Sequence, residues 1–135
     1  MGQPLRILIV DDSESSRELL RGLLTNRSYL LEEAVDADSA MGLLEKSLRD
    51  NTPFDLVLCD WNMPGKSGLQ LTRELRADLR FRALPIIMIT TENQFEQIKT
   101  AIASGANNFL TKPYTIQSLF EKLDFVIEKY RVGKG

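Results

Sequence analysis

The chain has 135 residues, of which 43% are hydrophobic and 27% are charged, as in an ordinary globular domain. Its 17 basic and 19 acidic residues give a formal net charge of −2, and the sequence pI of about 5.2 is far below that of a typical nucleic-acid-binding domain. The absence of histidine and the single cysteine, Cys59, exclude Ser-His-Asp and Cys-His catalysis, histidine-ligated zinc and an intramolecular disulfide. Because there is no long apolar run and no signal-peptide core, we expect one cytoplasmic domain over residues 1–135 that binds neither membrane nor nucleic acid directly.

Five short apolar runs predict β-strands, at residues 7–10, 30–35, 56–59, 86–89 and 109–110. Three of the runs are continuously apolar and rich in Ile, Val and Leu, as expected for strands that are buried on both faces. The second run carries Glu32 and Glu33 and the fifth is very short, so we expect these two strands at the edges of the sheet.

Apolar residues at helical spacing follow each of these runs. They are Leu19, Leu20, Leu23 and Leu24; Met41, Leu44 and Leu48; Leu71, Leu75 and Leu79; Phe95, Ile98 and Ile102; and Ile116, Leu119, Phe120, Leu123, Val126, Ile127 and Tyr130. Ser13 and Asp38 are the expected N-caps of the first two helices. Five strands that alternate with five helices predict an α/β fold with a doubly wound parallel sheet.

Polar side chains follow four of the predicted strands. They are Asp11 and Asp12 after the first strand, Asp60 after the third, Thr90 after the fourth, and Lys112 two residues after the fifth. In open α/β sheets, ligands bind beyond the carboxyl ends of the strands, where the strand order reverses. Three carboxylates suit Mg²⁺, and a lysine and a hydroxyl opposite them would bind the remaining oxygens of a phosphoryl group.

These residues lie in four motifs, ILIVDDS, LVLCDWNMPGKSGL, PIIMITTEN and GANNFLTKPY. In this order and spacing the motifs resemble the receiver domains of bacterial two-component response regulators, and the likeness covers the whole chain. Within that family the sequence is most similar to the single-domain chemotaxis type. The resemblance implies a flavodoxin-like (βα)5 fold with strand order 2-1-3-4-5, which puts the reversal beside Asp12 and Asp60.

The resemblance also implies a role for each acidic residue. Asp60 would be the phosphoacceptor, taking a phosphoryl group from a phosphohistidine of a sensor histidine kinase. Asp12 and Asp60 would bind Mg²⁺ directly together with the backbone carbonyl of Asn62, while Asp11 would act mostly through water. Self-phosphotransfer and autodephosphorylation are the only reactions expected, so the protein would not be an enzyme in the usual sense.

Further residues of the motifs would form the switch. Lys112, joined to Pro113 by a cis peptide bond in the family, would pair with a phosphoryl oxygen, and Thr90 would move to bond another. Phe109 matches the aromatic residue that turns inward as the threonine moves, although it lacks the hydroxyl of the tyrosine found in many chemotaxis receivers. The switched surface, made by the fourth helix, fifth strand and fifth helix, would bind a protein target such as the flagellar motor switch or another effector.

The positions expected to modulate dephosphorylation are Asn62, Thr91 and Glu92. Thr91 departs from the family, because the residue after the switch threonine is usually Ala or Gly. A bulkier side chain there affects access of water to the phosphoryl group.

Three other functions compete with this interpretation of the sequence. A receiver excised from a larger, DNA-binding regulator stays open, because the chain ends at RVGKG soon after the last predicted helix. A haloacid-dehalogenase-like phosphatase uses similar residues, but its nucleophile follows the first strand in a DxD motif, whereas Asp60 precedes Trp61 and Asn62. A flavodoxin-like FMN carrier would need a phosphate-binding loop where Asp11 and Asp12 would repel the phosphate.

Overall fold

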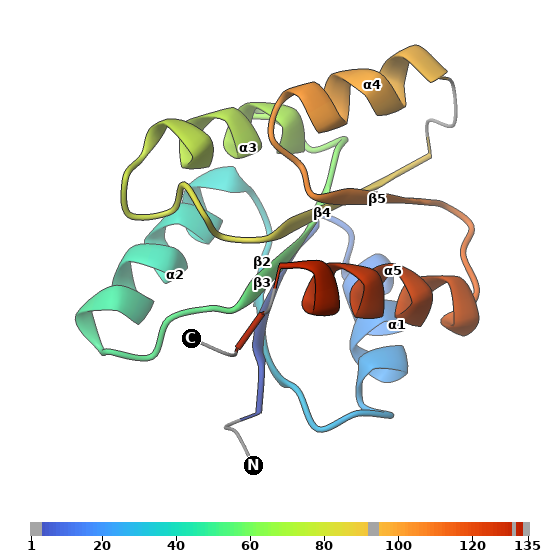
Figure 1. Cartoon of the computed structure of the whole chain (residues 1–135), viewed down its shortest axis with the longest axis horizontal. Coiled ribbons are helices and arrows are strands. Elements are labelled where there is room, and N and C mark those ends of the chain that lie inside the picture. The colour runs from blue at the N-terminus through green and yellow to red at the C-terminus, as the bar shows by residue number, and fades with distance from the viewer. Residues whose placement is uncertain (1–3, 92–94, 131, 134–135) are drawn as a thin grey trace.

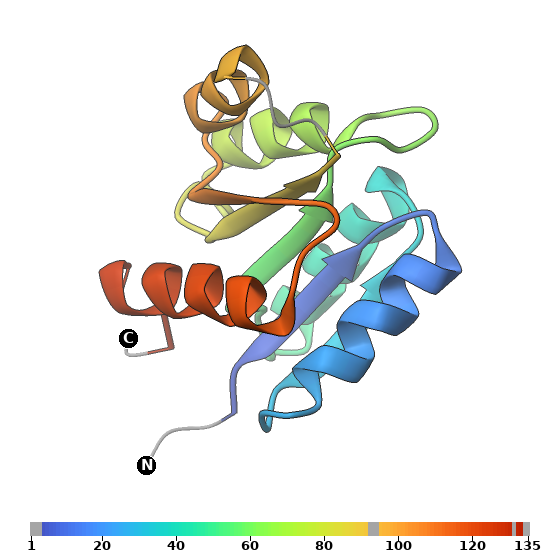
Figure 2. The ribbon, with the colours of Figure 1, turned by 90° about the vertical axis from the view of Figure 1, so that its right-hand side faces the viewer.

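A five-stranded parallel sheet forms the centre of the structure, and helices cover both of its faces (Figures 1 and 2). The computed structural model describes residues 4–91, 95–130 and 132–133. Its strands are β1 (Arg6–Val10), β2 (Leu30–Ala34), β3 (Leu56–Asp60), β4 (Ile86–Thr90) and β5 (Asn108–Thr111), and its helices are α1 (Glu14–Leu24), α2 (Ala37–Arg49), α3 (Gly68–Ala77), α4 (Phe95–Ala103) and α5 (Ile116–Lys129). The strand order β2-β1-β3-β4-β5 confirms the predicted fold and places β2 and β5 at the edges.

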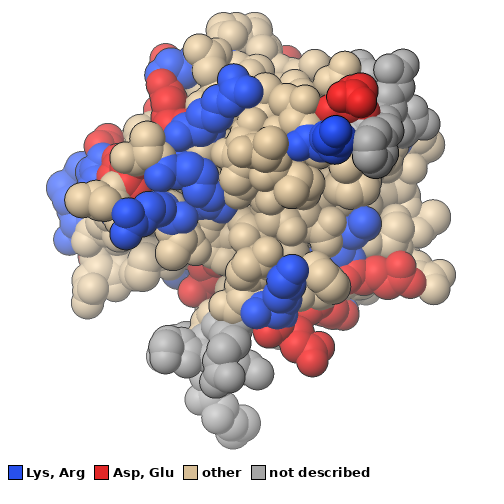
Figure 3. All heavy atoms as spheres, turned by 45° about the horizontal axis from the view of Figure 1, so that its top comes forward, with Lys and Arg blue, Asp and Glu red and all other residues tan. Residues whose placement is uncertain are grey.

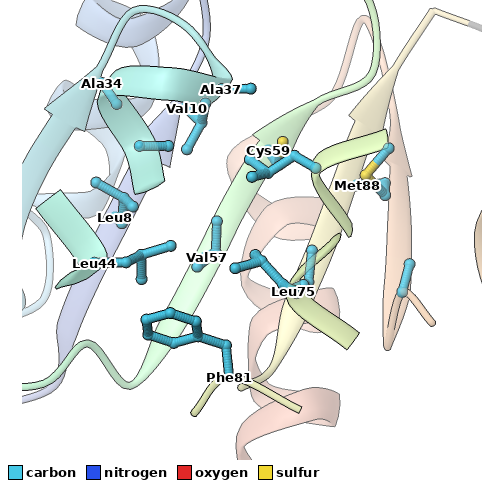
Figure 4. Packing of buried hydrophobic residues seen from close by; sticks show 14 of the residues in the cluster. Leu8, Val10, Ala34, Ala37, Leu44, Val57, Cys59, Leu75, Phe81 and Met88 are labelled. Carbon is cyan, nitrogen blue, oxygen red and sulfur yellow. The ribbon is translucent and has the colours of Figure 1, made fainter. Parts of the chain in front are cut away.

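The central strands are buried on both faces because alternate side chains point to opposite sides of a strand. In β1, Leu8 and Val10 belong to the hydrophobic cluster under α2, α3 and α4, whereas Ile7 and Ile9 belong to the cluster under α1 and α5. Figure 4 shows the first cluster, in which Leu44 of α2 lies close to strands β1 and β3. Full burial of a side chain of this size stabilises the fold by about 1.5–3 kcal/mol.

The helix starts follow local capping chemistry, with one correction to the prediction. Ser13 caps α1 as expected, and its hydroxyl accepts a hydrogen bond from the amide of Ser16. The cap of α2 is Asp36 rather than Asp38, because Asp36 is the residue with extended backbone angles and its carboxylate accepts from the amide of Ser39. Asp38 lies inside the first turn, where an acidic side chain still favours the helix dipole.

Some residues of the predicted apolar stripes are exposed. Leu79 is 79% exposed, because α3 ends at Ala77 and leaves this residue in the following turn. The other exposed members are Leu19, Leu48, Ile102, Ile116 and Tyr130. Helical spacing therefore predicted more buried residues than the structure has, because a residue at the margin of an apolar stripe contacts both core and solvent.

The amino-terminal edge of the sheet is closed by paired polar groups. The backbone amide of Arg6 donates to the Asp55 carboxylate at 2.8 Å. The guanidinium of Arg76 in α3 donates to the carbonyls of Gly105 and Phe81 and, at 2.8 Å, to the side chain of Asn107. These bonds join the α3–β4 and α4–β5 connections.

Several charged side chains on the outer surface form ion pairs. On the face shown in Figure 3, basic and acidic groups are neighbours at several places. Arg80, for example, pairs with Asp78 and Glu45, and Lys66 pairs with Glu74. Among the described residues, no helix has both the length and the apolar character needed to cross a membrane.

Candidate functional site

The strand order brings the predicted acidic residues together at the carboxyl-terminal edge of the sheet. Strands β1 and β3 are neighbours, with Val10 opposite Cys59, so the residues that end these strands meet. One carboxylate oxygen from each of Asp11, Asp12 and Asp60 lies within 4.8 Å of the others. Asp11 and Asp60 are buried, whereas Asp12 is exposed. The site is therefore an acidic group that is open to solvent on the Asp12 side.

Asp11 is held by both its backbone and its side chain. Its amide donates to the carbonyl of Ala34 in β2 at 3.1 Å. Its carboxylate accepts the amide of Ser13 at 2.9 Å and the ammonium of Lys112 at 3.4 Å. These bonds satisfy a carboxylate that is only 2% exposed and that would otherwise be costly to bury.

Asp60 ends β3 and is 7% exposed. Its burial, and then the negative charge of Asp11, raise the pKa of its carboxyl group from 3.8 to about 6. The Lys112 ammonium, 3.6 Å away, and a hydrogen bond from the backbone amide of Asn62 act in the opposite direction and lower that pKa, while Asp12 raises it further. Lys112 thus pairs with two of the three clustered carboxylates, Asp11 and Asp60, and the cluster has an excess of negative charge.

A glycine allows α3 to begin directly behind Asp60. The amide of Gly68 donates to the carbonyl of Trp61 at 2.9 Å, which closes the loop after β3. A Cβ atom at Gly68 would lie 2.1 Å from the carbonyl oxygen of Asp60, so a larger residue cannot occupy this position without moving the backbone. The amino-acid sequence does not indicate this role, because its only signal is a glycine eight residues after the aspartate.

Lys112 directly follows the edge strand β5 and reaches the acidic group from that side of the sheet. Its amide donates to the carbonyl of Thr90 at 2.8 Å, which ties the end of β5 to the end of β4. The peptide bond between Lys112 and Pro113 is cis. Its ammonium lies between Asp11 and Asp60, at 3.4 and 3.6 Å from their oxygens.

The predicted switch residues lie on β4, which neighbours β3, and on the edge strand β5. Thr90 is buried at the end of β4, and Phe109 is half-buried on β5 opposite Met88. The ammonium of Lys122 in α5 lies 4.4 Å from the centre of the Phe109 ring, within the range of a cation–π contact. The Phe109 ring therefore contacts α5 through Lys122.

The residues expected to modulate dephosphorylation are placed only in part. Asn62 and Thr91 are exposed at the same edge of the sheet, one after β3 and the other after β4. Glu92 lies outside the described residues.

A hollow of about 590 Å³ opens beside Asp12, between the loops that follow β2 and β3. It is lined by Asp12, Val35, Asp36, Ala37, Asp38, Pro64, Gly65 and Lys66. The hollow gives solutes access to the acidic group from the α2 side. The donors present at the site, carboxylate and carbonyl oxygens with one opposing ammonium, match the ligands that Mg²⁺ takes in proteins.

Comparison with known proteins agrees with this geometry. Residues 7–124 match the model of the response regulator receiver domain. The chain is 40% identical over 123 residues to the chemotaxis protein CheY1 of Helicobacter pylori, covering 91% of this chain and 97% of that protein. It is 38% identical over 130 residues to the chemotaxis protein CheY-3 of Vibrio cholerae, covering 96% of each.

A solved structure, that of the chemotaxis protein CheY4 of Vibrio cholerae, superimposes with a TM-score of 0.80 at 31% identity and covers 92% of this chain and 99% of that one. These relatives do not favour the phosphatase or the FMN carrier. With five parallel strands in the order 2-1-3-4-5 and a match over residues 7–124, the chain belongs to the family of response regulator receiver domains.

Proposed function

We propose that this protein is a phosphorylation-activated receiver, comprising residues 1–135 as one domain, that works in the cytoplasm in chemotaxis-type signalling. Asp60 accepts a phosphoryl group from the phosphohistidine of a sensor histidine kinase. The single observation that carries the proposal is the position of the Asp60 carboxylate, beside Asp11 and Asp12 and 3.6 Å from the Lys112 ammonium. The chemotaxis relatives support the signalling class.

The nucleophile is a carboxylate oxygen of Asp60. It must be ionised to attack phosphorus, and its pKa of about 6 leaves most of the group ionised at neutral pH. As the oxygen–phosphorus bond forms, the phosphorus–nitrogen bond to the kinase imidazole breaks and the imidazole leaves with that electron pair. The product is an acyl phosphate on Asp60.

A divalent metal fits the excess negative charge of the site. Asp12 and Asp60, with the backbone carbonyl of Asn62, would hold Mg²⁺ directly, and Asp11 would act through water. When bound, Mg²⁺ offsets the carboxylate charge and binds phosphoryl oxygens. Lys112, on the opposite side, binds another of these oxygens.

Autodephosphorylation reverses the modification by attack of water on phosphorus. Asn62, Thr91 and Glu92 set how readily water reaches it. Replacing Thr91 with alanine removes bulk from an exposed position next to Thr90, so the acyl phosphate of the Thr91→Ala variant should decay faster. Decay is followed by intact mass after removal of the phosphodonor.

Phosphorylation acts through Thr90 and Phe109. The hydroxyl of Thr90 moves toward the phosphoryl group, and the Phe109 ring fills the space that it leaves. Reversing a two-state equilibrium from about 1:99 to 99:1 takes roughly 5.5 kcal/mol. A hydrogen bond to a charged group supplies about 1.5–3 kcal/mol, so Thr90, Lys112 and the backbone amides act together. The surface of α4, β5 and α5 then binds a protein effector, such as the flagellar motor switch.

The proposal is tested by incubating the protein with Mg²⁺ and acetyl phosphate and measuring its intact mass. The wild-type chain should gain one phosphoryl group, and the Asp60→Asn variant none. Asp38→Asn is the matched control, because Asp38 is an exposed carboxylate that lines the adjacent hollow without belonging to the acidic group. Uptake that survives in Asp60→Asn would overturn the assignment.

The switch is tested separately by backbone amide NMR with and without beryllofluoride, which mimics the acyl phosphate. Shifts should extend from the acidic group to Phe109 and α5. In Phe109→Ala, uptake at Asp60 should persist while the shifts in α5 shrink. Shifts confined to the acidic group would contradict this part of the proposal.

A further inference from the structure

Arg17 of α1 links the acidic site to the edge strand β2. Its side chain is 14% exposed. One nitrogen, Nη1, donates to the backbone carbonyl of Asp11 at 2.8 Å, and another, Nε, donates to the Glu33 carboxylate at 3.1 Å. Figure 2 shows α1 running alongside β1, at whose end the acidic residues lie.

Glu33 fixes the direction of the Arg17 guanidinium. It lies on β2, where its backbone is paired with Ile9, and its carboxylate also accepts from Nη1 of Arg21. The guanidinium of arginine is planar, so anchoring Nε on Glu33 determines where Nη1 points. In this structure it points at the carbonyl of Asp11.

That carbonyl belongs to the peptide unit that joins Asp11 to Asp12. A peptide unit is planar, so a bond that holds the carbonyl oxygen of Asp11 also sets the orientation of the Asp12 amide in the same plane. The amide of Asp11 is held from the other side by Ala34. The backbone from which Asp12 projects is therefore held between β2 and α1, although Asp12 itself is exposed.

We infer that Arg17 is a positioning residue of the Mg²⁺ site: its hydrogen bond to the Asp11 carbonyl orients the Asp11–Asp12 peptide and thereby places the Asp12 carboxylate for the metal. This inference rests on the proposed function, because it requires Mg²⁺ to bind at Asp12 and Asp60. Neither Arg17 nor Glu33 is a ligand. Each acts through the backbone of the acidic pair.

Arg21 provides the matched control. It pairs with the same carboxylate of Glu33, from the next turn of the same helix, but has no hydrogen bond to Asp11 among the contacts of the described residues. If Arg17 only fastened α1 to β2 through Glu33, losing either arginine would have the same kind of effect. If Arg17 orients Asp12, only its loss weakens the metal site.

The experiment titrates Mg²⁺ alone, without phosphodonor, and follows the fluorescence of Trp61, which adjoins Asp60. Wild type, Arg17→Met, Arg17→Lys and Arg21→Met are compared, and urea unfolding is measured for each. Because loss of a residue that orients a ligand weakens metal binding about 10–100-fold, Arg17→Met should lower the Mg²⁺ affinity by at least about tenfold. Arg21→Met should stay close to wild type, and Arg17→Lys should fall between wild type and Arg17→Met.

The outcomes separate this inference from the function on which it rests. If wild type does not bind Mg²⁺, the proposed metal site fails and the inference fails with it. If wild type binds but Arg17→Met binds equally well, or Arg21→Met weakens binding as much, the positioning role is overturned while the metal site stands. If Arg17→Met does not fold, Arg17→Lys decides, and wild-type affinity in that variant overturns the inference.

Discussion

The amino-terminal and carboxyl-terminal edges of the sheet, where the strands begin and end, differ in how their charged groups are paired. At the amino-terminal edge Asp55 and Arg76 have close hydrogen-bond partners: Asp55 accepts the amide of Arg6 at 2.8 Å, and Arg76 donates to three acceptors at 2.8–3.2 Å. At the carboxyl-terminal edge three carboxylates are clustered, and the ammonium of Lys112 contacts two of them, Asp11 and Asp60, at the longer distances of 3.4 and 3.6 Å.

The difference indicates that the amino-terminal edge contributes to the stability of the fold, whereas the carboxyl-terminal edge serves its function. A buried polar group with good partners supports the fold, whereas crowded carboxylates destabilise it until a cation arrives. Burial, and then the neighbouring charge of Asp11, raise the pKa of Asp60, and the crowded carboxylates make this edge suited to a metal ion and a phosphoryl group. Each edge can be altered separately, which makes the comparison testable.

The largest effect on stability is expected at the amino-terminal edge. Arg76→Met keeps much of the aliphatic stem but leaves the carbonyls of Gly105 and Phe81 without their donor, and should lower the free energy of unfolding by about 2–3 kcal/mol. Urea unfolding measures the loss, with the exposed Arg73 of the same helix, as Arg73→Met, for control. Phosphoryl uptake should be unchanged, and a loss of uptake in the folded variant would break the separation between the edges.

At the carboxyl-terminal edge, a substitution is expected to raise the free energy of unfolding instead of lowering it. Because the pKa of Asp60 is raised, this residue is protonated in the folded protein but ionised in the unfolded chain between about pH 4 and pH 6. The contribution of Asp60 to the free energy of unfolding is therefore present at low pH and is lost as the pH rises to about 6. Without Mg²⁺, Asp60→Asn should therefore be more stable than wild type by about 1–3 kcal/mol at pH 7.5.

The comparison is made by urea unfolding of both proteins from pH 4 to pH 8. The stability advantage of Asp60→Asn should be small near pH 4 and grow up to about pH 6. A difference that does not vary with pH would show that the raised pKa of Asp60 is not its source.

The metal site should depend on Asp12 with little effect on the fold. Asp12 is exposed, so Asp12→Ala should change the free energy of unfolding by no more than about 0.5 kcal/mol. Its Mg²⁺ affinity, measured by Trp61 fluorescence, should fall at least about tenfold, because a small hard cation needs its carboxylate ligands. Equal affinity in the two proteins would place the metal elsewhere.

The smallest free-energy change is expected at the contact between β5 and α5, away from the ends of the central strands. The contact of the Lys122 ammonium with the Phe109 ring holds the ring toward α5 and is worth about 0.5–1 kcal/mol at an exposed site. Lys122→Gln should shift Phe109 toward its inward position by roughly two- to fivefold before phosphorylation.

Aromatic NMR of Phe109 with and without beryllofluoride follows this shift. Lys129→Gln is the control, because Lys129 contacts the rings of Phe125 and Tyr130 instead. Identical Phe109 spectra in Lys122→Gln and wild type would show that the contact has no part in the switch.

Much of the site could be read from the chain, because its residues follow the strands directly. Asp11, Asp12 and Asp60 each come at or just after the end of an apolar run, and parallel strands bring such positions to one edge. The strand order, by contrast, came from the resemblance to receiver domains, since periodicity identifies strands without saying which strand pairs with which.

Two predictions made from the sequence, a helix cap and a buried leucine, were wrong because of the local backbone conformation. Asp36 and Asp38 are both suitable caps by residue type, and only the backbone angles decide between them. Leu79 continues the spacing of Leu71 and Leu75, but α3 ends before it, and spacing alone contains no stop signal there.

By itself the sequence determined the elements, the two-sided burial of the central strands and the identity of the acidic residues, since these depend on neighbours a few positions away. Only the tertiary structure decided how those residues are held. The contact of Gly68 with the backbone of Asp60, the bond from Arg17 to the Asp11 carbonyl and the place of Lys112 between two carboxylates join separate elements. Such contacts depend on strand order and helix docking, which bring together backbone groups that have no signature of their own in the sequence.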